Sequence, residues 1–375
     1  MRKLFRIIII FLNILAAVSL ALAYLCCFVN PETIWWIGFF GLAYMYILLI
    51  NICFILFWAL SRKKIWILIS TVTVLAGWSF VGKNLQLFEK EISDEEMENS
   101  FKILSFNVQG FTQRNTVQHD GEMVNIFDFF QEEDADIICL QEYSVNQWKK
   151  EDLKEENVRK QLNKTPFYHS EISRNRSGIA TFSKYPIIRK ELVYADKSNN
   201  ACMCSDLLIG ADTVRVYNVH LKSVGLQDEQ LELLYDVEIN EYEWADVYTV
   251  KSMIRQMKSS SLVRAQQVKI LSSHIAQSPY PVIICGDFNE PPTSFSYRKV
   301  RGNLNDAFVE SGAGRSATFD VGRIASLRID YILYSDVFKA YDYEMQRIVL
   351  SDHFPVMCRL VKESPENRVT THKSE

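Results

Sequence analysis

The chain has 375 residues and a formal net charge of −4 at pH 7, a length that suits one large domain or two ordinary ones. Residues 1–89 hold seven Lys or Arg and two acids, so the remaining 34 basic and 43 acidic residues make residues 90–375 net acidic. Because proteins bind duplex DNA mainly by neutralising phosphates with Lys and Arg, this balance weakens the case for a polyanionic duplex as substrate.

Three long apolar segments open the chain, at residues 7–29, 34–60 and 65–81. Each has about the length that a helix needs to cross a bilayer, and none contains a charged residue. Helices that lack a polar face cannot all be core helices of one globular domain. We therefore predict a membrane domain over residues 1–83 with three transmembrane helices joined by short loops.

Basic residues predict the orientation of these helices. Arg2, Lys3 and Arg6 precede the first segment, and a second basic group at 62–64 lies between the second and third segments. By the positive-inside rule both groups face the cytoplasm, so the chain leaves the third helix on the other side. Residues 1–23 also resemble a cleavable signal peptide, and its removal would leave the orientation unchanged. We expect an integral protein of a bacterial inner (plasma) membrane with an extracytoplasmic C-terminal domain.

Residues 84–100 are polar and acidic and indicate a tether. From residue 101 onward, short apolar runs alternate with segments of helical periodicity. The expected strands cover residues 102–106, 137–140, 179–182, 204–209, 214–219, 282–285, 329–334 and 355–360. The expected helices cover residues 123–132, 149–162 and 262–276. Residues 227–258 form a long polar and aromatic insertion, and residues 362–375 are expected to be a flexible tail.

The sequence PVIICGDFNEPP at 281–292 places polar groups directly after an apolar run. The run indicates a buried strand, and Gly286 allows the chain to turn where the strand ends. Asp287 and Asn289 stand two residues apart on an extended segment, so their side chains project together. A carboxylate beside an amide oxygen suits Mg²⁺, Mn²⁺ or Ca²⁺. An ordinary Asx turn closed by prolines is the alternative interpretation.

Other expected strands also carry oxygen or imidazole groups at their ends. Asn107 and Glu142 each follow an apolar run, and each also fits a solvated or loop-bonding role. Asn218 and His220 share one face of a strand, where a lone histidine is more often a hydrogen-bonded core residue. The residues with such groups, including three that the next paragraph describes, are Asn107, Glu142, Asn218, His220, Asp330, Asp352 and His353.

Asp330 is the least easily explained by packing. It lies beside Ile329 and near Ile332, and a charge between apolar residues is costly unless it is paired, for example with an imidazolium. Asp352 and His353 stand together before the last strand, where Asp352 could instead cap a turn. Counted with the segment that holds Asp287 and Asn289, six separate strand ends carry such groups. Six independent coincidences are a poor explanation for this pattern.

Taken together, these segments resemble the endonuclease/exonuclease/phosphatase superfamily with its deoxyribonuclease-I-like fold. The matching pieces span residues 101–361 and read SFNVQG (105–110), LQE (140–142), SGIATFSK (177–184), NVHLKS (218–223), CGDFNEPP (285–292), RIDYI (328–332) and SDHFPV (351–356). The resemblance implies an α/β fold, a two-sheet α/β sandwich flanked by helices, with the site at one edge. It also implies phosphoester hydrolysis by metal-activated water, with Mg²⁺ or Mn²⁺ as cofactor.

The resemblance further implies roles for individual residues. Asn107, Glu142 and Asp352 are expected at the metal. Asp287 is expected to orient or deprotonate the attacking water, while Asn289 holds a phosphate oxygen. His353, paired with Asp330, is expected to act as a base or to stabilise the phosphate. His220, with Asn218 alongside, is expected to contact the phosphate or the leaving oxygen.

One departure concerns the partner of His220. Some deoxyribonuclease-like members supply a carboxylate for this histidine from just before the SGIA-type strand. Here that segment reads Asn175-Arg176-Ser177-Gly178, without an acid. Arg174 and Arg176 are candidates to hold substrate phosphate, or are simply exposed loop charges.

Two substrate classes remain open at this point. A nuclease acting on external nucleic acid is one hypothesis. A lipid or small-molecule phosphodiesterase is the other, favoured by the membrane segments, the acidic domain and the aromatic residues Tyr235, Tyr242, Trp244 and Tyr248. A catalytically silent binding protein of the same fold is a third, less favoured hypothesis.

Overall fold

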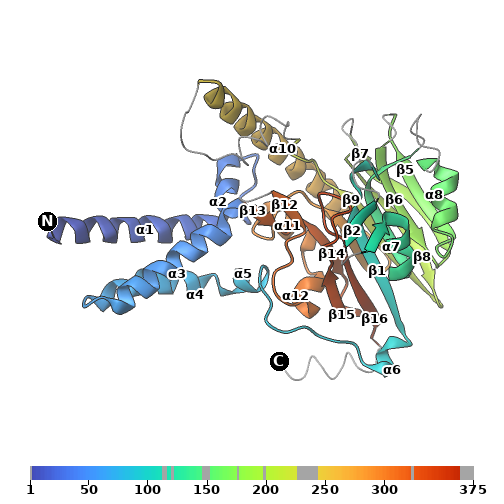
Figure 1. Cartoon of the computed structure of the whole chain (residues 1–375), viewed down its shortest axis with the longest axis horizontal. Coiled ribbons are helices and arrows are strands. Elements are labelled where there is room, and N and C mark those ends of the chain that lie inside the picture. Colours follow the sequence, from blue (N-terminus) through green and yellow to red (C-terminus); the bar gives the residue numbers. More distant parts are fainter. Residues whose placement is uncertain are drawn as a thin grey trace.

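The computed structural model describes residues 2–111, 116–119, 122–145, 153–174, 177–196, 200–225, 244–321 and 325–363. The helices of the first eighty or so residues project from one side of a globular part that contains the strands (Figure 1). The predictions for Arg176 and for the tail beyond residue 363 lie outside the described residues, as do Tyr235 and Tyr242.

Two six-stranded sheets form the centre of the globular part, within the ranges that the structure describes. The first sheet has the order β15 (Phe338–Met345), β16 (Val356–Lys362), β1 (Ser100–Asn107), β4 (Ile137–Ser144), β6 (Ser177–Ser183), β5 (Phe167–Ile172). The second has the order β11 (Asn305–Asp306), β14 (Asp330–Tyr334), β10 (Val282–Asp287), β9 (Asp212–His220), β8 (Ala201–Ile209), β7 (Ile187–Ala195). Two short hairpins join β2 (Thr116–His119) to β3 (Glu122–Asn125) and β12 (Phe319–Val321) to β13 (Ala325–Leu327).

The sheets pack face to face, and helices cover their outer faces (Figure 1). Ile103, Cys139, Val216 and Cys285 belong to the apolar layer between the sheets. The helices and 3₁₀ turns of the globular part are α6 (Asp94–Met97), η3 (Gln109–Phe111), α7 (Ile126–Glu133), α8 (Glu155–Gln161), α10 (Trp244–Ala276), α11 (Phe295–Arg301) and α12 (Ala307–Ser311). This arrangement confirms the predicted two-sheet α/β sandwich.

Mixed strand direction brings the strand ends to one edge. β1 runs parallel to β4, and β9 runs parallel to β10, so Asn107 pairs in register with Gln141 and His220 with Asp287. β14 runs antiparallel to β10, which places the start of β14, Asp330, directly beside Asp287. Polar residues from separate segments therefore meet at a single edge of the sandwich.

Gly286 is required where β10 passes β9. Its φ is +150°, and a Cβ at this position would lie 1.9 Å from the carbonyl oxygen of Val219. Any larger residue would push the two strands apart at the point where they hold Asp287 and His220 in register. The glycine that marks the turn in the sequence thus serves close strand approach.

The prediction of three transmembrane helices is wrong in detail. Within the described residues, one helix, α1 (Arg2–Cys26), is long and apolar enough by itself to cross a membrane. The second segment consists of η1 (Trp35–Ile37), α2 (Gly38–Leu42) and α3 (Tyr44–Leu60), and it bends by 60°. The third consists of η2 (Lys64–Trp66), α4 (Ile67–Ala76) and α5 (Trp78–Gly82).

The bend in the second segment has a local cause. The Thr293 hydroxyl donates to the carbonyl of Gly41 at 2.7 Å, and the Cys26 thiol donates to the carbonyl of Thr293 at 2.7 Å. The start of this segment is therefore packed on the globular part instead of continuing the axis of α3. Hydropathy does not predict this contact, because an apolar segment has the same hydropathy whether lipid or protein covers it.

A buried polar network holds α1, α3 and α4 together. Asn13 donates to Ser70 at 2.6 Å and accepts from the Trp58 ring nitrogen at 2.9 Å, while Ser70 donates to Asn51 at 2.8 Å. Asn51 also donates to the carbonyl of Ala16 at 3.0 Å. Such side-chain bonds between apolar helices are typical of packing in lipid.

Residues 84–100, the predicted tether, lie along the globular part. Gln86 forms a β-bridge with Gly314, and the backbone N–H of Lys90 donates to the carbonyl of Ser311 at 3.3 Å. Ser93 caps α6 together with Glu96 before β1 begins. These contacts join the projecting helices to the strand that carries Asn107.

Some elements carried no sequence signal. β7 carries three consecutive charged residues, Arg189, Lys190 and Glu191, instead of an apolar run, and β15 has an irregular register against β16. α10 begins at Trp244, well before the predicted start at residue 262, and thus includes the end of the insertion. Its amphipathic pattern is weak, which explains why only the C-terminal half was predicted.

Candidate active site

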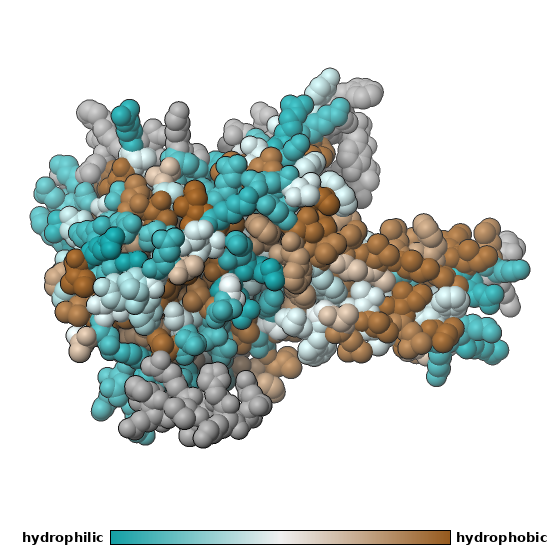
Figure 2. Space-filling view, turned by 180° about the vertical axis from the view of Figure 1, so that it is seen from behind, coloured by the Kyte–Doolittle hydropathy of each residue, from teal (hydrophilic) through white to brown (hydrophobic). Residues whose placement is uncertain are grey.

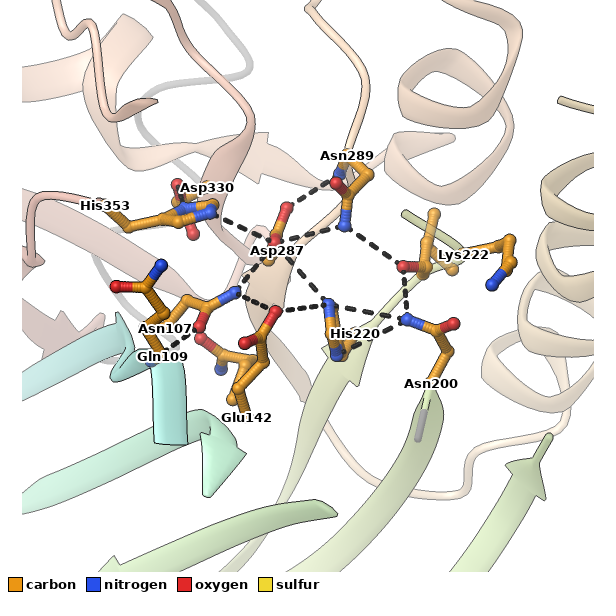
Figure 3. A network of polar contacts seen from close by, with 12 residues as sticks. Asn107, Gln109, Glu142, Asn200, His220, Lys222, Asp287, Asn289, Asp330 and His353 are labelled. Carbon is orange, nitrogen blue, oxygen red and sulfur yellow. Dashed lines mark hydrogen bonds and ion pairs between the residues drawn. The ribbon is translucent and has the colours of Figure 1, made fainter. Parts of the chain in front are cut away.

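Seven of the predicted site residues converge at the common edge of the two sheets (Figure 3). They come from the ends of β1, β4, β9 and β10, from the start of β14 and from the segment before β16. The seven are Asn107, Glu142, His220, Asp287, Asn289, Asp330 and His353.

Asp287 is the centre of the cluster and is 1% exposed. Its Oδ2 accepts from Asn107 Nδ2 and from Asn289 Nδ2, both at 3.1 Å, and its Oδ1 accepts from the backbone N–H of Asn289 at 2.7 Å. Burial, opposed by His353 and assisted by the neighbouring charge of Asp330, raises the pKa of Asp287 to about 6. A carboxylate with this pKa is largely ionised at neutral pH and can still accept a proton.

Asn289 is held by the turn that follows β10. Its φ is +52°, a left-handed conformation that asparagine tolerates better than most residues. Its Nδ2 also donates to the carbonyl of Leu221 at 3.1 Å, so the amide bridges Asp287 and the end of β9. The turn thus fixes the two side chains of the GDFN motif toward one another (Figure 3).

His353 is buried and paired with Asp330. Its Nδ1 lies 2.9 Å from Asp330 Oδ2, its Nε2 lies 3.7 Å from Asp287 Oδ2, and the ring of Phe319 covers it at 4.8 Å between centroids. Burial disfavours the charged ring, but the carboxylates of Asp330 and Asp287 outweigh burial and raise the pKa of His353 to about 10. His353 is therefore an imidazolium at neutral pH.

Glu142 and Asn107 form the more open side of the cluster. Glu142 sits at an irregularity between β4 and β6 with a φ of +50°, and its side chain is 36% exposed. Asn107 donates its Nδ2 to Glu142 at 3.3 Å, and its Oδ1 accepts from the backbone N–H of Gln109 at 3.1 Å. Glu142 is thus the carboxylate of the cluster that solvent reaches.

Asp352 follows Ser351, whose hydroxyl donates to the carbonyl of Asn107 at 2.8 Å. Loss of hydration raises the pKa of the Asp352 carboxyl group. The positive charge of His353 lowers this pKa, and the negative charge of Glu142 raises it further. The carboxylates of Glu142 and Asp352 therefore lie on the same side of the site.

His220 lies between the two halves of the cluster. Its Nε2 is 3.7 Å from Glu142 Oε1 and 3.7 Å from Asp287 Oδ2. Asn200 Nδ2 lies 3.4 Å from the same nitrogen and also donates to the carbonyl of Leu221 at 3.0 Å. An amide from the start of β8 therefore stands beside this histidine, where the sequence offered no acid.

The other candidates lie apart from this cluster. Asn218 is fully buried between the sheets, where its Nδ2 donates to the carbonyls of Leu140 and Ala180 and its Oδ1 accepts from Gln141. Its amide is thus used to join the two sheets. Arg174 is exposed in the segment between β5 and β6, and no contact among the described residues links it to the cluster.

Sequence reasoning missed Asn200, Gln141 and Ser351. Asn200 meets His220 across two strands, and Gln141 meets Asn218 across the two sheets, so neither pair has a local spacing signal. Ser351 and Gln141 do fall inside the matching pieces SDHFPV and LQE, which was the available clue.

The chemistry of the donor set fits a hard divalent cation. Glu142 and Asp352 provide half-exposed and exposed carboxylates. The Nδ2 of Asn107 faces Glu142 and Asp287, so the amide would have to turn its Oδ1 toward the cation in order to bind it. Asp287, Asp330 and His353 also lie within 4.8 Å of one another. That second group is a poor cage, because His353 is protonated and Asp330 is paired with it. Oxygen donors around Glu142 suit Mg²⁺ or Mn²⁺.

The two-sheet α/β sandwich holds buried carboxylates and a carboxylate-paired histidine at one edge, an arrangement suited to phosphoester hydrolysis. The chain belongs to the endonuclease/exonuclease/phosphatase family, whose family model matches residues 104–353. A model described as a domain of unknown function (DUF8431) matches residues 3–84. No curated protein matches the chain.

Solved structures of this family are similar to the chain at low identity. An endonuclease/exonuclease/phosphatase from Beutenbergia cavernae is 14% identical over 71% of this chain and 72% of that chain, with a TM-score of 0.49. A family protein from Bacteroides thetaiotaomicron is 19% identical over 71% and 98%, with a TM-score of 0.43. TDP2 from D. rerio, complexed with a single-strand DNA product, is 12% identical over 70% and 98%, with a TM-score of 0.48.

Proposed function

We propose that this protein is a membrane-anchored, divalent-metal-dependent phosphodiesterase in which Asp287 activates the attacking water. The observation that carries this proposal is the set of contacts at Asp287, where a buried carboxylate of raised pKa is oriented by two amides and faces an imidazolium. A base with a pKa near neutrality and a preorganised cation are the groups that attack on an anionic phosphoester requires.

In the proposed reaction, water attacks phosphorus while one proton passes to Asp287. Asn289 binds a phosphate oxygen, and the His353 imidazolium stabilises the negative charge that develops on phosphorus. The bond between phosphorus and the leaving oxygen then breaks, and His220 assists departure of that oxygen by hydrogen bonding or proton donation. Asp330 keeps His353 charged, which makes Asp330 a positioning residue.

Glu142, Asn107 and Asp352 would hold the metal. When bound, Mg²⁺ or Mn²⁺ supplies positive charge to the phosphate oxygens. A bound cation would also relieve the repulsion between the carboxylates of Glu142 and Asp352.

Removal of divalent metal is expected to abolish hydrolysis of bis-para-nitrophenyl phosphate by the full chain in detergent. Chelation should leave no activity above background, and added Mg²⁺ or Mn²⁺ should restore it. Glu142→Gln should raise the metal concentration needed for half-activation by about 10- to 100-fold, the range seen when a metal site is weakened. A steady-state metal titration of each variant measures this.

Glu171→Gln is the matched control, since Glu171 is a carboxylate on β5 that contacts His169. Its half-activation should equal that of the unaltered chain. Activity that survives chelation, or equal metal dependence of Glu142→Gln and the control, would contradict the metal assignment.

Anchoring by the N-terminal helices is supported by their exposed apolar surface. Leu4, Phe5, Phe11 and Leu60 are all more than half exposed, and the projecting helices are largely covered by apolar residues (Figure 2). The basic residues in the first turns of α1 and at 62–64 favour a cytoplasmic end and an extracytoplasmic globular part.

The chain should remain in membranes after an alkaline carbonate wash. A protease added to intact spheroplasts should digest the globular part. Release by the wash would contradict anchoring, and protection from the protease would contradict the orientation.

A further inference from the structure

An open pocket separates the projecting helices from the turn that carries Asn289. Its empty volume is about 700 Å³, including the part open to solvent. One wall consists of apolar residues of the segment that joins α1 to α3, among them Ile34, Phe39 and Leu42. The opposite wall is the loop after β10 together with Met257 of α10 and Phe295 of α11.

We propose that this pocket binds the hydrocarbon part of a lipid phosphoester, which places the phosphate of that lipid at Asp287. This inference rests on the proposed function and specifies its substrate class. The occupant is an amphiphile with at least one long alkyl chain and a phosphodiester headgroup.

The pocket and the candidate active site share Asn289. Asn289 lines the pocket and donates to Asp287 Oδ2 at 3.1 Å, so a molecule in the pocket lies one residue from the reactive carboxylate. Glu290 is the next residue of the lining, and it pairs with Arg264 at 2.9 Å. Polar side chains therefore lie where the lining includes residues next to Asp287 in the sequence.

The pocket is also continuous with the helices that we place in the membrane. Cys26, the last residue of α1, lines it, and the apolar surface of the projecting helices reaches the globular part at their junction (Figure 2). Lipid chains that surround α1 can therefore enter without crossing water. Each buried alkyl group adds to the gain from leaving water, so a long chain gains far more than a short one.

The segment between α1 and α3, which forms one wall of the pocket, is bonded to the loop after β10. The Cys26 thiol and the carbonyl of Gly41 both bond to Thr293, and the guanidinium of Arg298 lies 4.2 Å from the centre of the Phe28 ring. A Cβ on Gly41 would lie 2.3 Å from the carbonyl oxygen of Thr293, so the approach is as close as glycine allows. The pocket is thus a fixed feature of the junction.

Charge favours a lipid over a nucleic acid as occupant. Of the described residues that line the pocket, Arg264 alone has a cationic side chain, and Glu290 neutralises it. Strands of nucleic acid are bound by unpaired Lys and Arg together with stacking aromatics. An apolar wall with a single paired cation matches an alkyl chain instead.

Gly38 provides a direct test. It lines the pocket, its φ of −57° is helical, and nothing lies within 4 Å of an added Cβ, so a larger side chain can enter the pocket without a backbone clash. Gly38→Phe should fill the space that the alkyl chain needs. Gly82→Phe is the matched control, because Gly82 ends α5 outside the pocket and its added Cβ would meet only the Gln86 side chain at 3.7 Å.

The experiment compares two substrates with the same leaving group, hexadecyl and ethyl para-nitrophenyl phosphate. The full chain is reconstituted in phosphatidylcholine vesicles, and kcat/KM is measured for both with saturating Mg²⁺. The unaltered chain and Gly82→Phe should prefer the hexadecyl substrate by about 100-fold or more, since several buried CH₂ groups are worth that factor. Gly38→Phe should lower this preference at least tenfold.

Each result decides between separate hypotheses. Equal preference in Gly38→Phe and the unaltered chain overturns the pocket assignment. Hydrolysis of the ethyl ester without any preference for the hexadecyl ester overturns the lipid substrate and leaves the proposed phosphodiesterase intact. Absence of hydrolysis of both esters, in a chain that retains its thermal transition, overturns the proposed function itself.

Discussion

Asp287→Asn is expected to lower kcat/KM for bis-para-nitrophenyl phosphate by about 100- to 10,000-fold, the range for loss of a general base. The carboxamide keeps the size of the side chain and can still accept from the backbone N–H of Asn289, which lies 2.7 Å from Oδ1. It cannot take a proton from water. Steady-state kinetics of the full chain in detergent with saturating Mg²⁺ measure the loss.

The same substitution should change the stability of the fold only slightly. The pKa of Asp287 is raised from 3.8 to about 6, so its ionised form is disfavoured in the folded state. This cost is absent below the unfolded-state pKa and is fully present above the folded-state value. At pH 8 and without metal, the neutral carboxamide of Asp287→Asn removes this cost, but its nitrogen replaces Oδ2 and leaves the Nδ2 donors of Asn107 and Asn289 without that acceptor. The two effects oppose one another, so thermal unfolding should show a change of only about 1 kcal/mol in the free energy of unfolding.

Asp206→Asn is the matched control, because Asp206 is a buried carboxylate that binds Arg215 at 2.6 and 2.8 Å far from the cluster contacts. Breaking this pair should lower the free energy of unfolding by about 3 kcal/mol, while the folded fraction keeps its kcat/KM. The two variants thus have opposite signatures. Full activity of Asp287→Asn would remove Asp287 from the role of base, and no activity in any variant would favour the catalytically silent hypothesis.

Asp330→Asn is expected to move the alkaline limb of the pH–rate profile to lower pH. In the unaltered chain, kcat/KM should rise as Asp287 loses its proton near pH 6 and fall as His353 loses its proton near pH 10. Asp330 lies 2.9 Å from His353 Nδ1 and is the largest contribution that raises the pKa of His353. Without it, the pKa of His353 falls toward its ordinary value of 6.5 and the active range narrows.

The rate should therefore fall much more at pH 9 than at pH 6, by at least tenfold in the ratio of the two. His353→Asn serves for comparison, since it should lose activity at both pH values and retain no alkaline limb of its own. Profiles of kcat/KM between pH 5 and 10.5 at one fixed Mg²⁺ concentration separate these cases. A uniform loss in Asp330→Asn with an unchanged alkaline limb would show that Asp330 does not hold the charge of His353.

The convergence of most candidate site residues was predictable because strand geometry is local. Asn107, Glu142 and Asp287 each follow an apolar run, and the ends of parallel strands meet at one edge of a sheet. Asp330 was predictable for a different reason, since a charge within an apolar strand needs a partner, and His353 is that partner at 2.9 Å. Neither inference needed a contact map.

The contact of Asn200 with His220 was not predictable, because it depends on the side-chain conformation of a residue that precedes β8, twenty residues from the end of β9. Asn218 shows the converse. Its position two residues before His220 indicated a place on the same face, but the second sheet covers that part of β9 and uses the amide for contacts between sheets. Spacing along a strand specifies a face, and only packing specifies what the face meets.

The sequence by itself determined the chemistry of this protein: an apolar N-terminal region, a net acidic domain and the strand-end carboxylates, amides and histidines of a phosphoester hydrolase. These properties depend on residue type and on spacing over a few residues. Tertiary structure alone decided where the apolar segments bend, which amide accompanies His220, and that the helix wall meets the turn of Asn289 at an apolar pocket. Those features depend on contacts between residues far apart in the chain, for which hydropathy and local periodicity carry no information.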